Sequence, residues 1–502
     1  MNFISILYSI FLLSVLGIYW SVNSESHRLW IILMASIVLY ASLQPQYLPL
    51  LAVLTLVNYQ LGVALGQNTA PGRHNFDFQI SNIEWQFAQA DWNRRRWKIM
   101  WLGIILNILI LATFKYVEPF LKFISTDTEN TSFFNFQLIA PLGISYFIFE
   151  CIAYLVDVYR GAPATKNWLK FAAYKIFFVK IASGPITRFH HFAHQLHTAR
   201  FPGGEQIADA LWLIARGALK KGILADNIGV YVDLCFGNIQ RAGSGDLWLG
   251  TFAYGLQLYL DFSGYVDIAR GGALLFGINL PQNFDAPYFS TSIAEFWRRW
   301  HMTLGDWLRN YLYFPLGGSR QGLTRTCINL IIVMLIAGIW HVEPRGFLGF
   351  VIWGLYHGIA LAIHRITDVL SDRTGTLENF WQSPLGVFLA WLLTQLMVFT
   401  AWIWFRLPNL QDSLLVFQRL FNHKADPQFI QQVYVEALKI SPPQLTFLLM
   451  AIATLMSLVY LFNRQFKLQF NWPVKILFVP MCFYLVAILA PEGSVPFIYF
   501  NY

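Results

Sequence analysis

Apolar segments alternate with short polar segments along the whole chain. A helix rises 1.5 Å per residue, so about 17–25 apolar residues cross the hydrocarbon core of a bilayer. The apolar segments lie near residues 3–22, 29–43, 46–66, 99–116, 139–158, 168–186, 247–278, 327–340, 383–405, 444–462 and 473–490, with one more around Trp353. This pattern predicts an all-α polytopic membrane protein with about eleven to thirteen membrane segments.

The composition agrees with a membrane protein. The 502 residues are 56% hydrophobic and only 12% charged, whereas soluble domains carry about 25% charged residues. The net charge of +8 is typical of Lys and Arg on cytoplasmic loops. Because no basic soluble domain is present, we expect no nucleic-acid partner. The four cysteines are far apart and mostly in apolar segments, so they form neither a disulfide framework nor a metal-spaced set.

Basic residues predict how the chain is oriented. The segment 3–22 has no charged residue and no cleavage-site pattern, so we expect it to remain as the first span. The polar segment 67–98 contains Arg94, Arg95 and Arg96, which favours a cytoplasmic position. Three crossings before it place the N-terminus outside the cytoplasm.

The same segment suggests how the chain is organised. Residues 82–97 combine Trp and Phe with charged side chains, as in a helix that lies in the membrane interface. We therefore expect an N-terminal part over 1–98, with membrane helices and this interfacial segment, and a core over 99–502. No linker rich in Gly, Pro or Ser separates them, so we expect one integrated membrane domain.

One apolar segment is unlike a plain membrane helix. Residues 168–186 contain Lys175, Lys180 and the pair Gly184-Pro185. This predicts a broken or re-entrant element, because non-helical backbone at membrane depth must be buried in protein or line a wet cavity.

Three histidines follow that segment. On a helix, His190, His194 and His197 would share one face. No carboxylate accompanies them and no His-Glu-x-x-His pattern is present. We therefore favour an amphipathic helix at the interface over a metal site, and expect no bound metal.

Two carboxylates interrupt a later apolar segment. Asp261 and Asp267 lie within 247–278, where each would cost about 2.5–3.5 kcal/mol at a helix centre. Each either pairs locally, for instance with Arg270 or a backbone amide, or takes a direct part in a site. The residues leave both alternatives open.

Residues 294–358 hold the highest concentration of polar and aromatic side chains between apolar spans. They include His301 and His341. Polar side chains are costly at this depth, so a functional role is the default hypothesis. For His341, His357 and His364, the residues alone are equally compatible with structural histidines at helix ends.

Several motifs resemble the membrane-bound O-acyltransferase (MBOAT) family, and most closely its bacterial branch for alginate O-acetylation and D-alanyl transfer to teichoic acid. The motifs run in order from about residue 100 to the end of the chain. They are Phe114-Lys115-Tyr116, Pro141-Leu142-Gly143-Ile144-Ser145, Tyr154-Leu155-Val156-Asp157-Val158-Tyr159-Arg160, Gly184-Pro185-Ile186, Asp261-Phe262-Ser263-Gly264-Tyr265, Phe296-Trp297-Arg298-Arg299-Trp300-His301, Tyr311-Leu312-Tyr313, Pro315-Leu316-Gly317-Gly318, Trp340-His341 and Phe497-Ile498-Tyr499-Phe500.

This resemblance implies an MBOAT-type O-acyltransferase with two essential histidines. His341 would accept the proton of the attacked hydroxyl, and His301 would hold the acyl thioester or carbonyl. Tryptophans around them would exclude water. Arginines of the region would bind phosphate or carboxylate groups, or would extend their side chains to the membrane interface instead. The candidate substrate-binding and donor-binding residues are Trp297, Arg298, Trp300, Arg309, Asn310, Trp340 and Asp261.

The resemblance also implies the substrates and partners. The donor would be a cytoplasmic acyl thioester, either acetyl-CoA or a carrier-linked acyl group, with no bound cofactor. The acceptor would be an exported polysaccharide or an extracytoplasmic acyl-relay protein. We expect membrane lipid, an extracytoplasmic SGNH-type acetyltransferase and a cytoplasmic acyl donor or carrier protein as partners, at the bacterial inner membrane.

Other functions stay open at this point. D-alanyl transfer to teichoic acid and O-acetylation of peptidoglycan would use the same fold. A transporter or flippase is disfavoured, because no repeat relates the halves of the chain. The family usually reads Trp-His-Gly, whereas this chain reads Trp340-His341-Val342 with a longer loop before Trp353. We expect the altered loop 342–346 to affect substrate choice more than reaction class.

Overall fold

The computed structural model describes residues 4–66, 94–118, 139–343, 346–466, 470–491 and 497–498. Every regular element in these residues is a helix, and the one β contact among them is an isolated bridge between Glu343 and Gly346. Eight of the described helices are long and apolar enough to cross a membrane. The prediction of an all-α polytopic membrane protein is confirmed.

The eight spans come from both ends of the chain. They are α2 (Glu25–Leu43), η1 with α3 (Pro45–Tyr47 and Leu48–Gly66), α5 (Arg94–Lys115), α15 (Gly322–His341), α16 (Leu348–Arg373), α18 (Pro384–Arg406), α21 (Pro442–Phe466) and α22 (Trp472–Leu489).

The larger number of segments predicted from the sequence includes four that are not among these eight spans. Helix α1 (Ile6–Ser21) has only 16 residues. Helices α7 (Ile144–Tyr159) and α12 (Ser244–Leu275) contain carboxylates. The segment 168–186 breaks after α8 (Trp168–Lys175).

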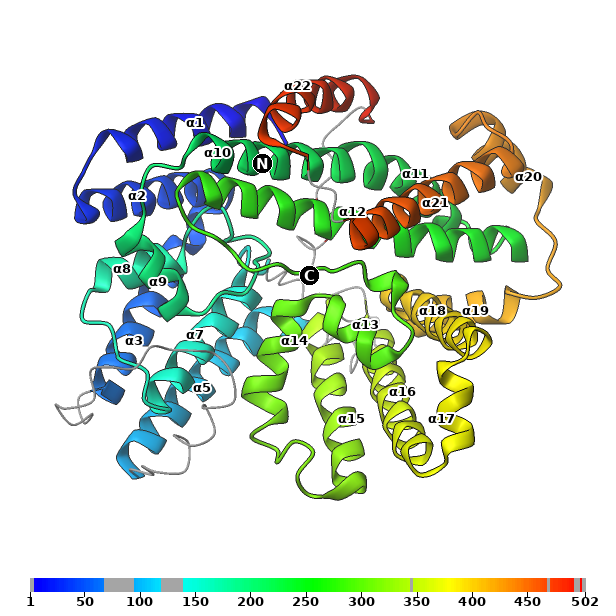
Figure 1. Ribbon diagram of the computed structural model, residues 1–502, viewed down its shortest axis with the longest axis horizontal. Helices are drawn as coiled ribbons and strands as arrows, with labels where there is room; N and C mark the ends of the chain where they lie inside the picture. The colour runs from blue at the N-terminus through cyan, green and yellow to red at the C-terminus, as the bar shows by residue number, and fades with distance from the viewer. Residues whose placement is uncertain are drawn as a thin grey trace, which may run out of the picture. The chain divides into compact units, whose positions relative to one another are not determined.

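The chain forms two compact units. Unit 1 comprises Met1–Gln206 with Gly272–Pro281, and unit 2 comprises Ile207–Gly271 with Gln282–Tyr502. Within unit 2, α15, α16 and α18 run alongside one another, with α17 (Gly375–Gln382) beside them (Figure 1). The sequence-based boundary near residue 98 stays a prediction.

The remaining helices of unit 2 lie around those spans. They are α10 (Gly204–Ala218, which begins in unit 1), η3 (Leu219–Ala225), α11 (Asp226–Gly237), η4 (Pro287–Phe289), α13 (Ile293–Arg299), α14 (Met302–Leu308), η5 (Arg309–Tyr313), α19 (Leu410–Arg419), α20 (Pro427–Ile430) and η6 (Gln431–Ala437). Segments η3, η5 and η6 are π-helical. Such segments often accompany functional sites.

Arg96 ties together three helix ends in unit 1. Its guanidinium donates to the carbonyls of Leu65 (3.1 Å), Val158 (3.0 Å) and Tyr159 (2.8 Å). Carbonyls at helix C-termini lack intrahelical partners and favour a cation. The start of α5 is therefore fixed to the ends of α3 and α7. The interfacial helix predicted over 82–97 lies mostly outside the described residues.

Further polar contacts pair the remaining helix ends of unit 1. At the start of α2, Glu25 forms ion pairs with Lys170 (2.6 Å) and His197 (2.8 Å). Beyond the other end of α2, Gln44 Oε1 accepts a hydrogen bond from the backbone amide of Leu142 (2.7 Å). The two ends of α2 are therefore fixed to α8 and α9 on one side and to the segment before α7 on the other.

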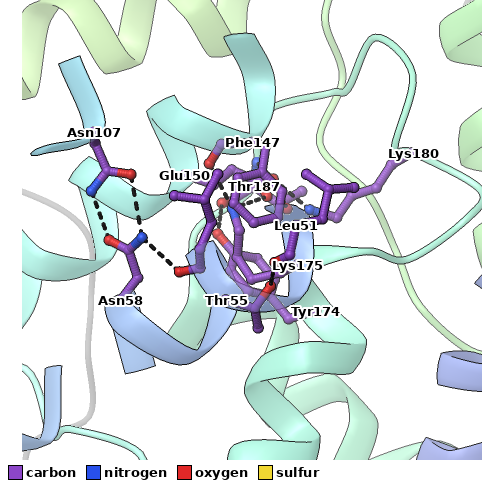
Figure 2. Close-up of polar contacts among 11 residues, drawn as sticks. Leu51, Thr55, Asn58, Asn107, Phe147, Glu150, Tyr174, Lys175, Lys180 and Thr187 are labelled. Atoms are coloured by element: carbon purple, nitrogen blue, oxygen red, sulfur yellow. Dashed lines mark hydrogen bonds and ion pairs between the residues drawn. The ribbon is translucent and has the colours of Figure 1, made fainter. Parts of the chain in front are cut away.

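A buried ionic network replaces helical structure after α8 (Figure 2). Glu150 accepts from Lys175 (3.3 Å), from Lys180, and from the backbone and hydroxyl groups of Thr187 (3.0 and 2.8 Å). Residues 176–187 are non-helical and buried throughout. The predicted break is confirmed, and the carboxylate of α7 holds both ends of the broken segment.

Candidate active site

The close packing of α15 against α16 places His341 in the interior of unit 2. Gly338 and Gly354 occupy the helix crossing. His341 is the last residue of α15, and only 3% of its surface is exposed. Small residues let two helix backbones approach closely, so the histidine that follows the crossing is held firmly.

Four aromatic side chains surround His341, and we call them the aromatic cage. The ring of His341 lies 4.6 Å from that of Trp340, 4.9 Å from Phe405, 5.4 Å from Trp353 and 6.5 Å from Phe350, measured between centroids. The cage combines residues of α15, α16 and α18. It provides the dry surroundings in which a proton-transfer group is protected from bulk water.

His301 lies at the junction of α13 and α14 in an unusual backbone conformation. Its φ of 43° and ψ of 54° are left-handed, and only 1% of its surface is exposed. A non-glycine residue in this region costs about 1–3 kcal/mol and is typical of functional positions. The strain turns the chain between two short helices and directs the imidazole inward.

Asn283 determines the tautomer of His301. Asn283 Oδ1 accepts from the backbone and hydroxyl groups of Thr303, both at 3.0 Å, and contacts His301 Nδ1 at 3.2 Å. An amide oxygen can only accept, so His301 Nδ1 carries the hydrogen and Nε2 carries the lone pair. Burial lowers the pKa of His301 from 6.5 to about 3, which keeps the ring neutral.

Trp340 connects the two histidines. Its ring lies 4.6 Å from that of His341 and 6.3 Å from that of His301. Phe262 packs against His301 from α12 at 4.9 Å. Residues from three separate parts of the sequence thus form one buried cluster, and the two predicted catalytic histidines share a neighbour in it.

Two predicted tryptophans extend this cluster. Trp297 packs against Trp353 at 5.8 Å, and Trp300 packs against Trp402 at 5.0 Å. Trp402 in turn contacts Phe405 of the aromatic cage at 5.5 Å. The predicted aromatic wall is therefore continuous from α13 to α18.

The predicted polar ligands are more dispersed. Arg298 is exposed, and Arg309 forms an exposed ion pair with Asp306 (2.7 Å). Asn310 is buried in η5. The role of these three residues as ligands stays a prediction.

Asp261 belongs to a buried ion triad. Its carboxylate pairs with Lys221 (2.7 Å) and accepts from the backbone amide of Ile498 (3.0 Å), while Lys221 also pairs with Asp226 (2.7 Å). Asp267 pairs with Arg216 and Lys220, each at 2.7 Å. These cations come from α10 and η3, and the backbone amide of Ile498 is a partner of the expected kind, while a direct part of either carboxylate in a site stays a prediction.

The three histidines of α9 (Phe189–Thr198) do not converge. His197 pairs with Glu25, while Phe189, Phe192 and Leu196 form the buried face of the helix. Within the described ranges, no group of three or more His, Cys, Asp or Glu side chains is arranged to hold a metal ion. The helix is amphipathic, as predicted.

The altered loop after His341 is attached to the end of α18. The backbone amide of Gly349 donates to the carbonyl of Pro408 (3.1 Å). A Cβ at Gly346 would lie 2.3 Å from the same oxygen. Glu343 is buried in this loop. Two glycines therefore let the loop pack directly on the backbone beside the aromatic cage.

Comparison with known proteins identifies the family. Residues 94–401 match the membrane-bound O-acyltransferase family, MBOAT. The chain belongs to this family. The match includes α13 to α16 and both candidate histidines, so the resemblance seen in the motifs is confirmed, and the protein is a multi-pass membrane acyltransferase.

Relatives of this MBOAT protein act on different polymers. It is 36% identical over 421 residues to the probable alginate O-acetylase AlgI of Pseudomonas aeruginosa, covering 82% of this chain and 73% of the relative. It is 34% identical over 416 residues to the peptidoglycan O-acetyltransferase of Helicobacter pylori, covering 78% and 72%. It is 27% identical over 360 residues to the teichoic acid D-alanyltransferase of Streptococcus thermophilus, covering 65% and 82%.

Proposed function

We propose that this MBOAT protein transfers an acetyl group from a cytoplasmic thioester to hydroxyl groups of an exported cell-surface polysaccharide, or to an extracytoplasmic relay protein. The observation that carries the proposal is His341, which lies buried in the aromatic cage at the end of α15, within the residues that match the family. The O-acetylase relatives are more similar to the chain than the D-alanyltransferase, which favours acetyl over D-alanyl.

His341 acts as the general base in this proposal. It takes the proton of the acceptor hydroxyl while the hydroxyl oxygen adds to the acyl carbon. The carbon–sulfur bond then breaks, and the leaving thiolate receives the proton. General-base assistance is worth about 10²–10⁴-fold in rate. The aromatic cage excludes water that would hydrolyse the thioester.

His301 takes a role different from the one expected from the sequence. Its hydrogen is on Nδ1, bonded to Asn283, so Nε2 accepts hydrogen bonds and cannot donate one to an acyl carbonyl. We propose that His301 Nε2 receives a hydrogen bond from the acceptor hydroxyl or from an amide of the donor. With a pKa of about 3, it is too weak a base at neutral pH to replace His341.

The donor approaches from the cytoplasmic side in this proposal. Basic residues near α2, α5 and α8, including Arg28, Arg96 and Lys170, lie at helix ends that contact one another in unit 1. Basic loops favour the cytoplasm. With the short apolar helix α1 as a first crossing, the N-terminus lies outside the cytoplasm of a bacterial inner membrane in this proposal. The exposed Arg298 is suited to bind phosphates of a CoA or carrier-linked donor.

The partners follow from the two substrates. A cytoplasmic acyl carrier protein would deliver a carrier-linked donor. An extracytoplasmic SGNH-type acetyltransferase would pass the acyl group to the polymer, and membrane lipid surrounds the spans. Arg309, Asn310 and Asp261 remain candidates for substrate contacts.

Mass spectrometry of cell-surface polymers tests this function. Deletion of the gene should remove O-acetyl esters from one polymer, and expression of the wild-type chain should restore them. His341→Ala should not restore them when the protein is present at the wild-type level. His27→Ala, which changes an exposed histidine of α2, is the matched control. Loss of D-alanyl esters would support the second activity, and no change in any ester would refute the proposal.

A further inference from the structure

Trp353 and His357 form a second polar pair beside His341. They lie four residues apart on α16, so both side chains project from the same helix face. Their rings are 4.8 Å apart, and that of Trp353 is 5.4 Å from His341. Only 1% of Trp353 and 0% of His357 is exposed.

Trp297 determines the tautomer of His357. The indole Nε1 of Trp297 donates to His357 Nδ1 at 3.3 Å. Since an indole nitrogen can only donate, Nδ1 must accept, and the hydrogen of the neutral ring lies on Nε2. A doubly protonated ring could not accept this bond. His357 therefore presents a hydrogen-bond donor, whereas His301 presents an acceptor.

The buried donors of this cluster for which no acceptor is found among the described residues include two on α16. They are His357 Nε2 and Trp353 Nε1. Elsewhere in unit 2, the indoles of Trp248 and Trp391 donate to the carbonyls of Leu420 and Tyr288, each at 3.0 Å. Buried polar groups in native proteins are nearly always paired. The pair on α16 is therefore suited to an acceptor atom that a substrate supplies.

We propose that Trp353 and His357 bind the carbonyl oxygen of the acyl donor and stabilise the oxyanion that forms on it. This inference rests on the proposed acyl transfer and names the chemistry of the same site. When the hydroxyl oxygen bonds to the acyl carbon, the carbonyl π electrons move to its oxygen, and the hydroxyl proton moves to His341. When the electrons return, the carbon–sulfur bond breaks and the thiolate takes the proton from His341.

The two hydrogen-bond donors, on Trp353 and His357, are then oriented before the reaction begins. Donors fixed toward the site of developing charge stabilise the transition state more than the ground state. Trp297 acts through His357 as a positioning residue, because its indole holds the Nε2–H tautomer. The rest of the cage keeps water from competing for both donors.

Two substitutions of His357 distinguish the loss of its hydrogen-bond donor from a loss of folding. His357→Asn retains an acceptor for Trp297 and removes the Nε2 donor, whereas His357→Gln places an amide donor near the original Nε2. Trp353→Phe removes the indole hydrogen and keeps an aromatic ring. Loss of one oxyanion donor costs about 10²–10³-fold in kcat. We expect this loss for His357→Asn and Trp353→Phe with little change in KM, and a smaller loss for His357→Gln.

The affinities of two acyl-donor analogues distinguish hydrogen bonding to the acyl carbonyl from a purely structural role of His357 and Trp353. The probes are the ketone analogue of acetyl-pantetheine, in which methylene replaces sulfur, and S-ethyl-pantetheine, which lacks the carbonyl oxygen. The wild-type protein in detergent should bind the ketone more tightly. His357→Asn and Trp353→Phe should lose this preference, and His357→Gln should keep part of it. Trp248→Phe, whose indole already has a protein acceptor, should behave as wild type.

Two results would overturn the inference. One is an equal affinity of the wild-type protein for both analogues. The other is a wild-type kcat in His357→Asn and Trp353→Phe. A wild-type protein that transfers no acyl group from any thioester would instead refute the proposed function, so the two failures are distinguishable.

Discussion

Gly338 of α15 and Gly354 of α16 meet backbone to backbone. A Cβ at Gly338 would lie 2.3 Å from the carbonyl oxygen of Phe350, and one at Gly354 would lie 2.6 Å from that of Met334. His341 follows Gly338 by three residues, and His357 follows Gly354 by three residues. The glycine crossing therefore sets the positions of the proposed base and one proposed oxyanion donor together.

Gly338→Ala tests this crossing. The added methyl group must displace α16, which costs about 1–3 kcal/mol of stability as overpacking. A shift of about 1 Å near reacting groups costs about 10²-fold in rate. We expect acyl transfer to fall by this order while the purified protein still elutes as a folded species in size-exclusion chromatography. Gly17→Ala, where nothing lies within 4 Å of the new methyl group, should leave the rate unchanged.

The buried ionic network around Glu150 leads to a separate prediction about the stability of the protein. Glu150→Gln leaves Lys175 and Lys180 (Figure 2) buried without their carboxylate. Removal of one partner from a buried ion pair costs about 3–5 kcal/mol. The thermal midpoint of the variant should fall sharply. Asp306→Asn removes an exposed ion pair worth at most about 1 kcal/mol, and a similar fall in that control would contradict the account.

The neutral state of His301 predicts a dependence of stability on pH. Its pKa is about 3 in the folded protein, whereas the ordinary value for histidine is 6.5, so below pH 6.5 the unfolded chain binds a proton that the folded chain excludes. The contribution of neutral His301 to the free energy of unfolding is therefore fully present above pH 6.5 and is lost as the pH falls toward 3. His301→Asn retains a donor for Asn283 and tolerates the left-handed backbone.

Thermal unfolding between pH 5 and 7.5 tests that dependence. The slope of the unfolding free energy against pH should be smaller in His301→Asn than in wild type, by at most about 1.4 kcal/mol per pH unit below pH 6.5. Identical slopes for the two proteins would show that His301 does not titrate in this way.

Local sequence signals predicted most of the fold and the main histidines. Length and apolarity indicated the spans, and Lys175, Lys180 and Gly184-Pro185 indicated the break after α8 because they conflict with a continuous apolar helix. His301 and His341 were identified as costly polar residues between apolar segments and by the family motifs.

The partners of those residues were not predictable from local patterns. Asn283 and Phe405 reach the histidines only through tertiary packing, and nothing in their own neighbourhood distinguishes them from other loop or helix residues. Asp261 had a plausible cation nearby on its own helix, but its partner is Lys221. The residues alone left the role of His357 open, because the role proposed for it depends on a tautomer that Trp297 determines.

Single-turnover acyl transfer by purified protein tests the central claim, that His341 is the base. The protein would be mixed with radiolabelled acetyl thioester and polymer acceptor, with donor binding measured in parallel. His341→Ala should bind the donor as tightly as wild type and transfer its acyl group about 10²–10⁴-fold more slowly. Transfer at the wild-type rate by folded His341→Ala would contradict the account.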